Sequence, residues 1–331
     1  MIITKTPFRI SFVGGGSDIE SYYKYYTGKV LSTSIDKYIY VAVKRQLGIV
    51  EFKYRVNWSQ TEFRNSIDEI KHPIVREALR YFKINYPIEI TTFSDIPSNT
   101  GLASSSAFAV GLVHALLAIE KKKISKKFIA KIAAKIEVDI LKRNIGKQDH
   151  YACSFGGFNE ILFFKNESVK VSPLKIENNK IKLLNQNLHL YYTSIKRNAS
   201  KILEDQKNLN QNQISNLLSL TKLVKPAKDI LTKQNIKINQ FGKILHLSWI
   251  LKKEISSKVT NKLLDKYYYD AQKAGSIGGK ILGAGKGGFF LFYTEKKNEI
   301  KLTRKLNNLK KLNFKFDFLG SQITYNENRK I

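Results

Sequence analysis

The chain has 331 residues, of which 43% are hydrophobic, and this composition is typical of a soluble globular protein with one large or two medium-sized domains. Its 57 basic and 27 acidic residues give a formal net charge of +30, which favours anionic partners. A nucleic-acid binder is the obvious non-enzyme interpretation of that charge. The basic residues are spread along the chain, however, without the interleaved aromatic residues typical of RNA-binding segments. We therefore expect small anionic ligands and no specific nucleic acid.

The first residues, MIITKTPFRI, lack the basic segment and small-residue cleavage site of a signal peptide. The longest apolar run, residues 107–119, is too short to cross a bilayer. Cys153 is the one cysteine of the sequence, which excludes an internal disulfide and favours a reducing compartment. These features predict a cytoplasmic protein that does not engage a membrane.

The first half of the chain predicts mixed strands and helices. Residues 8–13, FRISFV, alternate so that Arg9 and Ser11 lie on one face of a strand. Residues 125–143 predict a strong helix, with apolar residues every four positions. That apolar stripe consists of Phe128, Ile132, Ile136 and Ile140. Further elements are expected as strands at 38–43 and 88–94 and as helices at 74–82 and 103–120.

A second part begins near residues 188–194, after a stretch rich in asparagine and lysine. Its expected elements are helices around 198–207, 241–255 and 261–274 and a strand–loop–strand over 280–293. We predict an α+β protein with an N-terminal domain over residues 1–180 and a C-terminal domain over residues 181–331.

Residues 97–106, PSNTGLASSS, join a predicted strand to a predicted helix. Gly101 permits a tight turn, and Ser104, Ser105 and Ser106 fall in the first helical turn, whose N–H groups have no partners within the helix. Small residues allow a phosphate to approach those N–H groups, and hydroxyls add hydrogen bonds or a metal ligand. An ordinary helix cap would need one serine. The segment therefore predicts a phosphate-binding loop.

A second glycine-rich segment, GAGKGGFF at residues 283–290, fits the spacing G-x-G-x-x-G. In a dinucleotide-binding unit this loop is followed by a helix, whereas here the strand-like FFLFY follows. A glycine-rich hairpin remains as the structural interpretation. The chain also contains no G-x-x-x-x-G-K-[ST] segment and no protein-kinase signatures.

Two acidic residues near the middle of the chain, Glu137 and Asp149, are candidate site residues. Glu137 lies beside the apolar stripe of its predicted helix, where a carboxylate is costly unless a cation or another partner meets it. Asp139 instead neighbours Lys135, Lys142 and Arg143 and predicts a solvated surface pair. Asp149 is expected in a glycine-flanked turn before a strand, where an aspartate is often structural.

Three segments in order, TPFRISFVGGGSD (6–18), PSNTGLASS and GAGKGGFF, together resemble the motifs of the galacto-, homoserine, mevalonate and phosphomevalonate (GHMP) kinase family. The resemblance spans nearly the whole chain. It implies a two-part α+β fold, with an N-terminal part like a ribosomal-protein domain and a ferredoxin-like C-terminal part. It also implies a kinase that uses ATP and Mg²⁺.

The resemblance assigns roles to individual residues. Asp149 would accept or orient the proton of the acceptor hydroxyl, and Arg9 would hold that carboxylate. Ser105 and Glu137 would bind Mg²⁺, with waters and phosphates as its other ligands. The residues implied in nucleotide binding are Pro97, Gly101, Leu102, Ala103, Ser104, Ser105 and Ser106.

The acceptor is predicted from residues 14–18, GGGSD, which lack the Gly-Glu-His-Thr-Asp pattern of galactokinases. This form resembles the branch of heptose 7-phosphate kinases and fucokinases, and we expect D-glycero-D-manno-heptose 7-phosphate, with fucose or another hexose as the alternative. Lys286 departs from the family's all-small glycine loop, and its role is left open, as is a homodimer. The residues expected to bind the sugar phosphate are Gly15, Gly16, Ser17, Asp18, Lys147, Lys196, Arg197 and Gly285.

Overall fold

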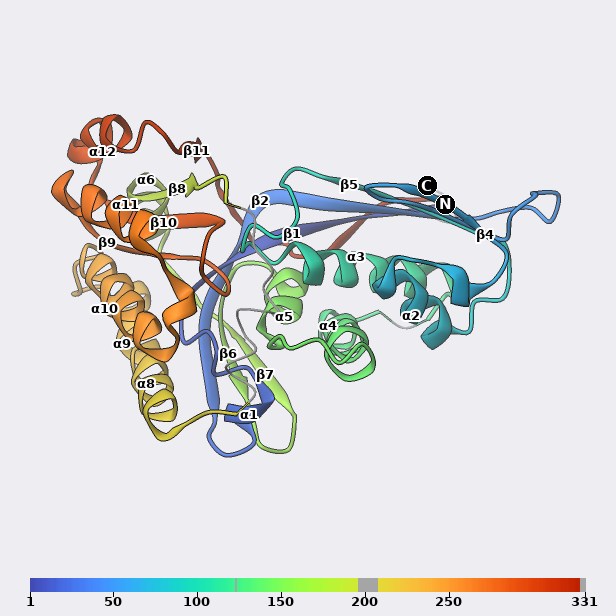
Figure 1. Cartoon of the computed structure of the whole chain (residues 1–331), viewed down its shortest axis with the longest axis horizontal. Coiled ribbons are helices and arrows are strands. Elements are labelled where there is room, and N and C mark those ends of the chain that lie inside the picture. The colour runs from blue at the N-terminus through green and yellow to red at the C-terminus, as the bar shows by residue number, and fades with distance from the viewer. Residues whose placement is uncertain (123, 196–207, 328–331) are drawn as a thin grey trace.

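A large sheet forms the N-terminal part of the computed structural model, which describes residues 1–122, 124–195 and 208–327 (Figure 1). Its strands follow the order β13-β1-β2-β5-β3-β4, and β2 also pairs with β6 and β12, while β7 pairs with β6. The strands are β1 (Ile2–Val13), β2 (Gly28–Arg45), β3 (Tyr54–Asn57), β4 (Thr61–Arg64), β5 (Ile88–Ser94), β6 (Phe158–Phe163), β7 (Val169–Pro173), β12 (Phe316–Asp317) and β13 (Gln322–Asn326).

Helices cover one face of this sheet (Figure 1). They are α2 (Pro73–Phe82), α3 (Ser104–Ile119), α4 (Lys126–Ala134) and α5 (Gln148–Phe155), with the short α1 (Glu20–Tyr23) after β1, a 3-10 turn at Ile67–Glu69 and a π-helical turn at Lys135–Ile140. The central helix is α3, which is buried from Ser106 to Leu117. It can lie close to the sheet because Gly111 has no side chain: a Cβ there would be 3.1 Å from Thr6 Oγ1.

A second sheet forms the C-terminal part, with strand order β11-β8-β10-β9. Numbered by chain position, this antiparallel order is 4-1-3-2, with helices between the first and second strands and between the third and fourth, which is the ferredoxin-like arrangement. The strands are β8 (Leu188–Tyr192), β9 (Ser276–Ile281), β10 (Phe289–Thr294) and β11 (Lys310–Leu312). The helices are α6 (Asn178–Asn187), α8 (Gln211–Lys222), α9 (Val224–Thr232), α10 (Gln240–Ile255), α11 (Lys262–Lys273) and α12 (Glu299–Lys305), with 3-10 turns at Ser257–Val259 and Lys296–Asn298.

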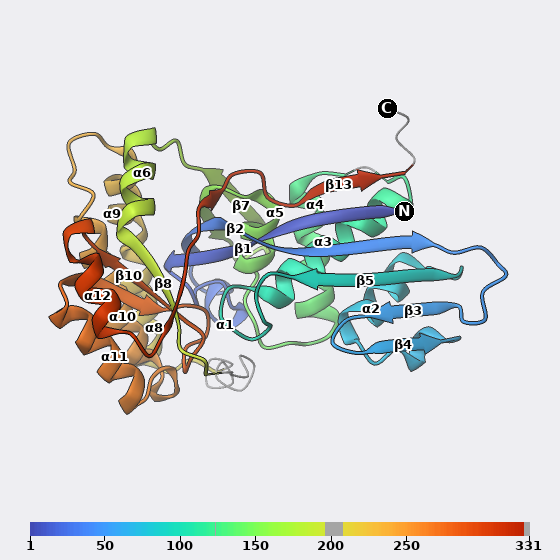
Figure 2. The same ribbon diagram turned by 90° about the horizontal axis from the view of Figure 1, so that it is seen from above.

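The end of the chain returns to the large sheet. After β11, the chain crosses to pair β12 with β2 and β13 with β1, so the last described strand lies beside the first (Figure 2). The two domains we propose, with their boundary at residue 180, therefore share one sheet. Residues 316–326 of the second domain complete the sheet of the first.

The predicted α+β class and most predicted elements are confirmed, but the helix expected over 125–143 differs from the prediction. The helix expected over 125–143 is α4 followed by a π-helical turn, and the helical run ends where Lys142 adopts a left-handed φ of 52°. The ends of its apolar stripe are also more exposed than expected, with Phe128 at 44% and Ile140 at 38%. The helix expected around 198–207 lies outside the described residues.

Candidate active site

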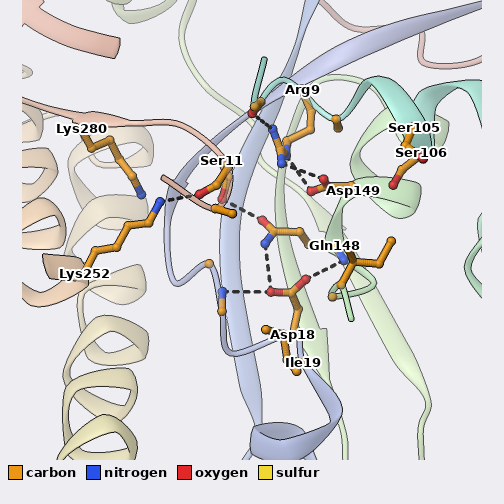
Figure 3. A pocket seen from close by; sticks show the side chains of 18 of the residues that line it. Arg9, Ser11, Asp18, Ile19, Ser105, Ser106, Gln148, Asp149, Lys252 and Lys280 are labelled. Carbon is orange, nitrogen blue, oxygen red and sulfur yellow. Dashed lines mark hydrogen bonds and ion pairs between the residues drawn. The ribbon is translucent and has the colours of Figure 1, made fainter. Parts of the chain in front are cut away.

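The two parts of the chain meet at a cavity of about 400 Å³. Its walls come from β1, the loop that follows β1, the start of α3 and the start of α5, all in the N-terminal part. The opposite wall comes from α10 and the end of β9 in the C-terminal part (Figure 3). Arg9 and Asp18 of the first predicted motif, Ser105 of the second motif and Asp149 therefore line one space.

Arg9 and Asp149 form a bidentate ion pair in this cavity (Figure 3). Arg9 Nε donates to Asp149 Oδ1 and Nη2 donates to Oδ2, both at 2.7 Å, while Nη1 donates to the Gly101 carbonyl at 2.8 Å. The Arg9 side chain is 4% exposed and that of Asp149 is 22% exposed. This parallel geometry fixes the carboxylate's orientation and leaves it accessible from the cavity.

Asp149 does not lie in a turn, as the sequence predicts, but is the second residue of α5. In the first turn of a helix, a carboxylate is favoured by the N-terminal end of the helix dipole. Gly146 lies just before this helix, and a Cβ there would lie 1.8 Å from Asp18 Oδ2. The glycine therefore allows the start of α5 to pack directly on Asp18.

The serine-rich segment begins α3 without a side-chain cap. Ala103, at the cap position, has a left-handed φ of 72°, and Ser104 Oγ instead accepts a hydrogen bond from the Asn99 N–H at 3.3 Å. Gly101 and Ala103 line the cavity together with the three serines. Pro97 and Leu102 do not line it: Leu102 is buried in the core, and its carbonyl accepts the Arg9 N–H at 3.2 Å.

The C-terminal glycine loop packs against this segment. The Phe289 N–H donates to the Thr100 carbonyl at 3.1 Å, and a Cβ on Gly288 would lie 2.1 Å from the same oxygen. Gly283 and Ala284 line the cavity, whereas Gly285 packs on the backbone of Val259. The glycines therefore let the two loops meet without side chains between them.

Glu137 is fully buried among polar partners. Its Oε1 accepts hydrogen bonds from the Ser105 hydroxyl and, at 2.7 Å, from Arg143 Nη1, and its Oε2 is 2.9 Å from His150 Nε2. Burial alone raises the pKa of Glu137, but the hydrogen bond and charge of His150 and the charge of Arg143 outweigh burial and leave this pKa below its usual value. Arg143 thus faces inward and pairs with Glu137. It does not form the surface pair expected with Asp139, which is exposed.

Ser105 and Glu137 supply the kind of oxygen ligands that Mg²⁺ prefers. Arg143 Nη1 lies 2.7 Å from both Ser105 Oγ and Glu137 Oε1, so a positive charge is already held between these two oxygens. The pair therefore fits a cation, which would take the place of the guanidinium. Among the described residues, no cluster of three or more His, Cys, Asp and Glu side chains offers another metal site.

Asp18 anchors the other side of the cavity and is 2% exposed. It accepts hydrogen bonds from the Gln148 N–H at 3.0 Å, from Gln148 Nε2 at 2.9 Å and from the Gly16 N–H at 3.0 Å, and Ser11 Oγ donates to Gln148 Oε1 at 2.7 Å. Burial and the nearby charge of Asp149 raise the pKa of Asp18. Gly15 and Gly16 line the cavity beside it.

Two further residues expected at the substrate, Ser17 and Lys147, do not line the cavity. The Ser17 hydroxyl donates to the Gly14 carbonyl at 2.7 Å, within its own loop. Lys147 packs over the Tyr23 ring at 5.1 Å, and Lys286 is exposed on the glycine loop; neither side chain lines the cavity. Lys196 and Arg197 lie outside the described residues.

The structure adds cavity residues to which the sequence assigned no role in the site: Ser11 and Gln148, and three from the C-terminal part, Ser248, Lys252 and Lys280. Lys280 Nζ donates to the Phe12 carbonyl at 2.8 Å and to Ser248 Oγ at 3.3 Å. Burial and the positive charge of Arg9 lower the pKa of Lys280 to about 7. The available sequence signal was a lysine at the start of the predicted strand–loop–strand over 280–293, next to the glycine loop.

Comparison with known proteins defines the class. Residues 73–157 match the model of the GHMP kinase N-terminal domain. The chain is 35% identical over 320 residues, 92% of its length and 93% of the relative's, to the D-glycero-alpha-D-manno-heptose 7-phosphate kinase of Campylobacter jejuni. The chain therefore belongs to the GHMP kinase family, as a sugar kinase.

The solved structures agree on the fold. A D-glycero-D-manno-heptose 1-phosphate kinase from Bacteroides thetaiotaomicron superposes with a TM-score of 0.79 at 24% identity, covering 99% of this chain and 100% of that one. A structure from Campylobacter jejuni has a TM-score of 0.75 at 29% identity and covers 97% of each chain. In the part of the chain that the structure describes, no helix has the length and apolar character to span a bilayer.

Proposed function

We propose that this sugar kinase transfers the γ-phosphoryl group of ATP to the anomeric hydroxyl of D-glycero-D-manno-heptose 7-phosphate and so forms the 1,7-bisphosphate. The observation that carries the chemistry is the Arg9–Asp149 pair, which shares one cavity with the serine-rich start of α3. The acceptor is supported by the likeness to the Campylobacter jejuni enzyme of that name over 92% of this chain. The product would feed nucleotide-activated heptose for surface polysaccharide.

In this proposal Asp149 receives the proton of the acceptor hydroxyl, or orients that hydroxyl for in-line attack. Arg9 holds the carboxylate through two parallel hydrogen bonds, and its positive charge offsets the charge that spreads over the transferring phosphoryl group. Asp18 and Gln148 form a network that can exchange hydrogen bonds with sugar hydroxyls. Catalysis then depends on positioning and charge stabilisation, with no covalent intermediate.

The nucleotide would bind along the first turn of α3. The first turn of α3 has no side-chain cap, and Ser104, Ser105 and Ser106 line the cavity, so that its N–H groups and hydroxyls would suit a triphosphate. Ser105 and Glu137 would hold Mg²⁺, whose charge neutralises phosphate oxygens when it is bound. Arg143, which now joins the same two oxygens, would move toward the phosphates. Cytoplasmic location and a homodimer remain predictions.

A second acceptor class is favoured by one observation. The chain is 27% identical over 322 residues to the bifunctional fucokinase/GDP-fucose pyrophosphorylase of Arabidopsis thaliana, although it covers 30% of that longer protein. A neutral sugar would use the Asp18 and Gln148 network equally well. Fucose is therefore the alternative acceptor.

The test is turnover of ATP with Mg²⁺ across a panel of acceptors: heptose 7-phosphate, fucose, galactose, mannose and mevalonate. Turnover confined to heptose 7-phosphate is the expected result. Turnover confined to a neutral sugar would keep the kinase chemistry and replace the acceptor. Turnover with mevalonate alone would show that the sugar assignment of the site is wrong.

A further inference from the structure

We propose that Lys280, with Lys252 beside it, forms a subsite for the phosphate group that the acceptor already carries before the reaction. This inference rests on the proposed function, because it concerns the second end of the same acceptor. The two side chains enter the cavity from β9 and α10, on the wall opposite Ser105 and Ser106 (Figure 3). A phosphate bound to them would lie away from the nucleotide loop.

The argument begins with the burial of Lys280, which is 4% exposed. Its ammonium group donates to the Phe12 carbonyl and to the Ser248 hydroxyl, and both partners are neutral. None of the ion pairs formed within residues 1–122, 124–195 and 208–327 involves Lys280. A buried ammonium group is costly unless a negative charge compensates it. The third N–H of this group can donate to an oxygen of a ligand in the cavity.

Lys252 extends the same wall. Its Nζ donates to the Ile281 carbonyl at 3.2 Å and to the Gly283 carbonyl, at the end of β9. These backbone contacts hold the ammonium group at the edge of the cavity, beside Lys280 (Figure 3). Ser248, on the same helix as Lys252, adds a hydroxyl to this wall. Two cations and a hydroxyl together form the donor set that a phosphate group requires.

The electrostatics agree with an anionic ligand. The lowered pKa of Lys280 follows from its burial and from the positive charge of Arg9, so these surroundings disfavour the ammonium form. A phosphate dianion beside it would favour that form. Lys147, which the sequence offered for the same task, packs on Tyr23 and does not reach the cavity. Selectivity for a sugar phosphate over a neutral sugar would then arise chiefly at Lys280, since a neutral sugar brings no negative charge to compensate its buried ammonium group.

The test compares the wild type with Lys280→Met in steady-state kinetics. We expect KM for heptose 7-phosphate to rise about 10- to 100-fold, as for the loss of a hydrogen bond to a charged group, while KM for ATP stays unchanged. Inorganic phosphate should compete with heptose 7-phosphate in the wild type and lose potency in the variant. With heptose that carries no phosphate as acceptor, the two proteins should have the same KM. Lys243→Met removes an exposed charge from the same α10 and should change none of these values.

The outcomes separate this inference from the proposed function. If the wild type phosphorylates heptose 7-phosphate and Lys280→Met leaves its KM unchanged, the subsite is wrong and the function stands. If the wild type turns over only a neutral sugar, both the proposed acceptor and the phosphate subsite are wrong. Thermal unfolding shows whether Lys280→Met is folded; if it is not, Lys252→Met takes its place. An unchanged KM in Lys252→Met would then overturn the subsite.

Discussion

Arg9 shows at the residue scale how the site tolerates a buried charge. Three of its N–H groups donate to Asp149 and to the Gly101 carbonyl, and the paired carboxylate balances its charge. The same contact positions Asp149, because two parallel bonds leave the carboxylate little freedom to rotate. Burial and function therefore depend on one interaction.

Asp149→Asn should keep ATP binding and lose nearly all turnover. An amide cannot accept the hydroxyl proton, and the loss of a general base typically lowers a rate about 10²- to 10⁴-fold. The measurement is kcat with the best acceptor, together with ATP binding by calorimetry. Asp139→Asn, the same change at an exposed position on the π-helical turn, should leave kcat intact. Turnover near the wild-type rate in Asp149→Asn would remove Asp149 from the mechanism.

At the scale of elements, α3 carries the nucleotide loop and is held from several sides. It lies between the sheet and the helices α2, α4 and α5, which explains why its residues from Ser106 to Leu117 are all buried (Figure 1). The contact with the sheet is closest at Gly111, opposite Thr6 and Val41. The close packing of α3 on β1 therefore places the serines at the start of α3 near Arg9.

Gly111→Leu should lower the free energy of unfolding by about 1–3 kcal/mol, because the added side-chain atoms force the helix away from the sheet. A Cβ alone would already be 3.1 Å from Thr6 Oγ1 and from Val41 Cγ2. Chemical denaturation measures the loss. Ala118→Leu, near the end of the same helix and only half-buried, serves as the control and should cost much less. Equal costs at the two positions would contradict close packing at Gly111.

At the scale of the whole molecule, the return of the chain end joins the two parts. Ser321, between β12 and β13, is buried, and its hydroxyl lies 2.8 Å from Thr6 Oγ1 and 2.9 Å from His114 Nδ1. Burial lowers the pKa of His114 to about 4, so that this imidazole is neutral near pH 7. One hydroxyl thus connects the last strands to β1 and to α3.

Ser321→Ala should lower the free energy of unfolding by about 1–3 kcal/mol, because it leaves Thr6 and His114 short of a buried hydrogen-bond partner. The measurement is a urea unfolding curve, and the transition should remain single if the two parts unfold together. Thr324→Ala, exposed on β13, is the matched control and should cost less. A Ser321→Ala curve that overlays the wild type would show that this contact does not stabilise the return of the chain end.

The sequence by itself predicted the motifs and their local conformations. Alternation in β1 placed Arg9 and Ser11 on one face, and small residues marked the start of α3, because side-chain periodicity and backbone sterics act over a few residues. The tertiary structure decided which charges meet. Arg9 and Asp149 are 140 positions apart, and Lys280 and Phe12 are 268 apart. Periodicity tells which face of an element is buried but not which distant element covers it. For that reason the helical position of Asp149, the inward turn of Arg143 and the two lysines of the cavity emerged only when the sheets were packed together.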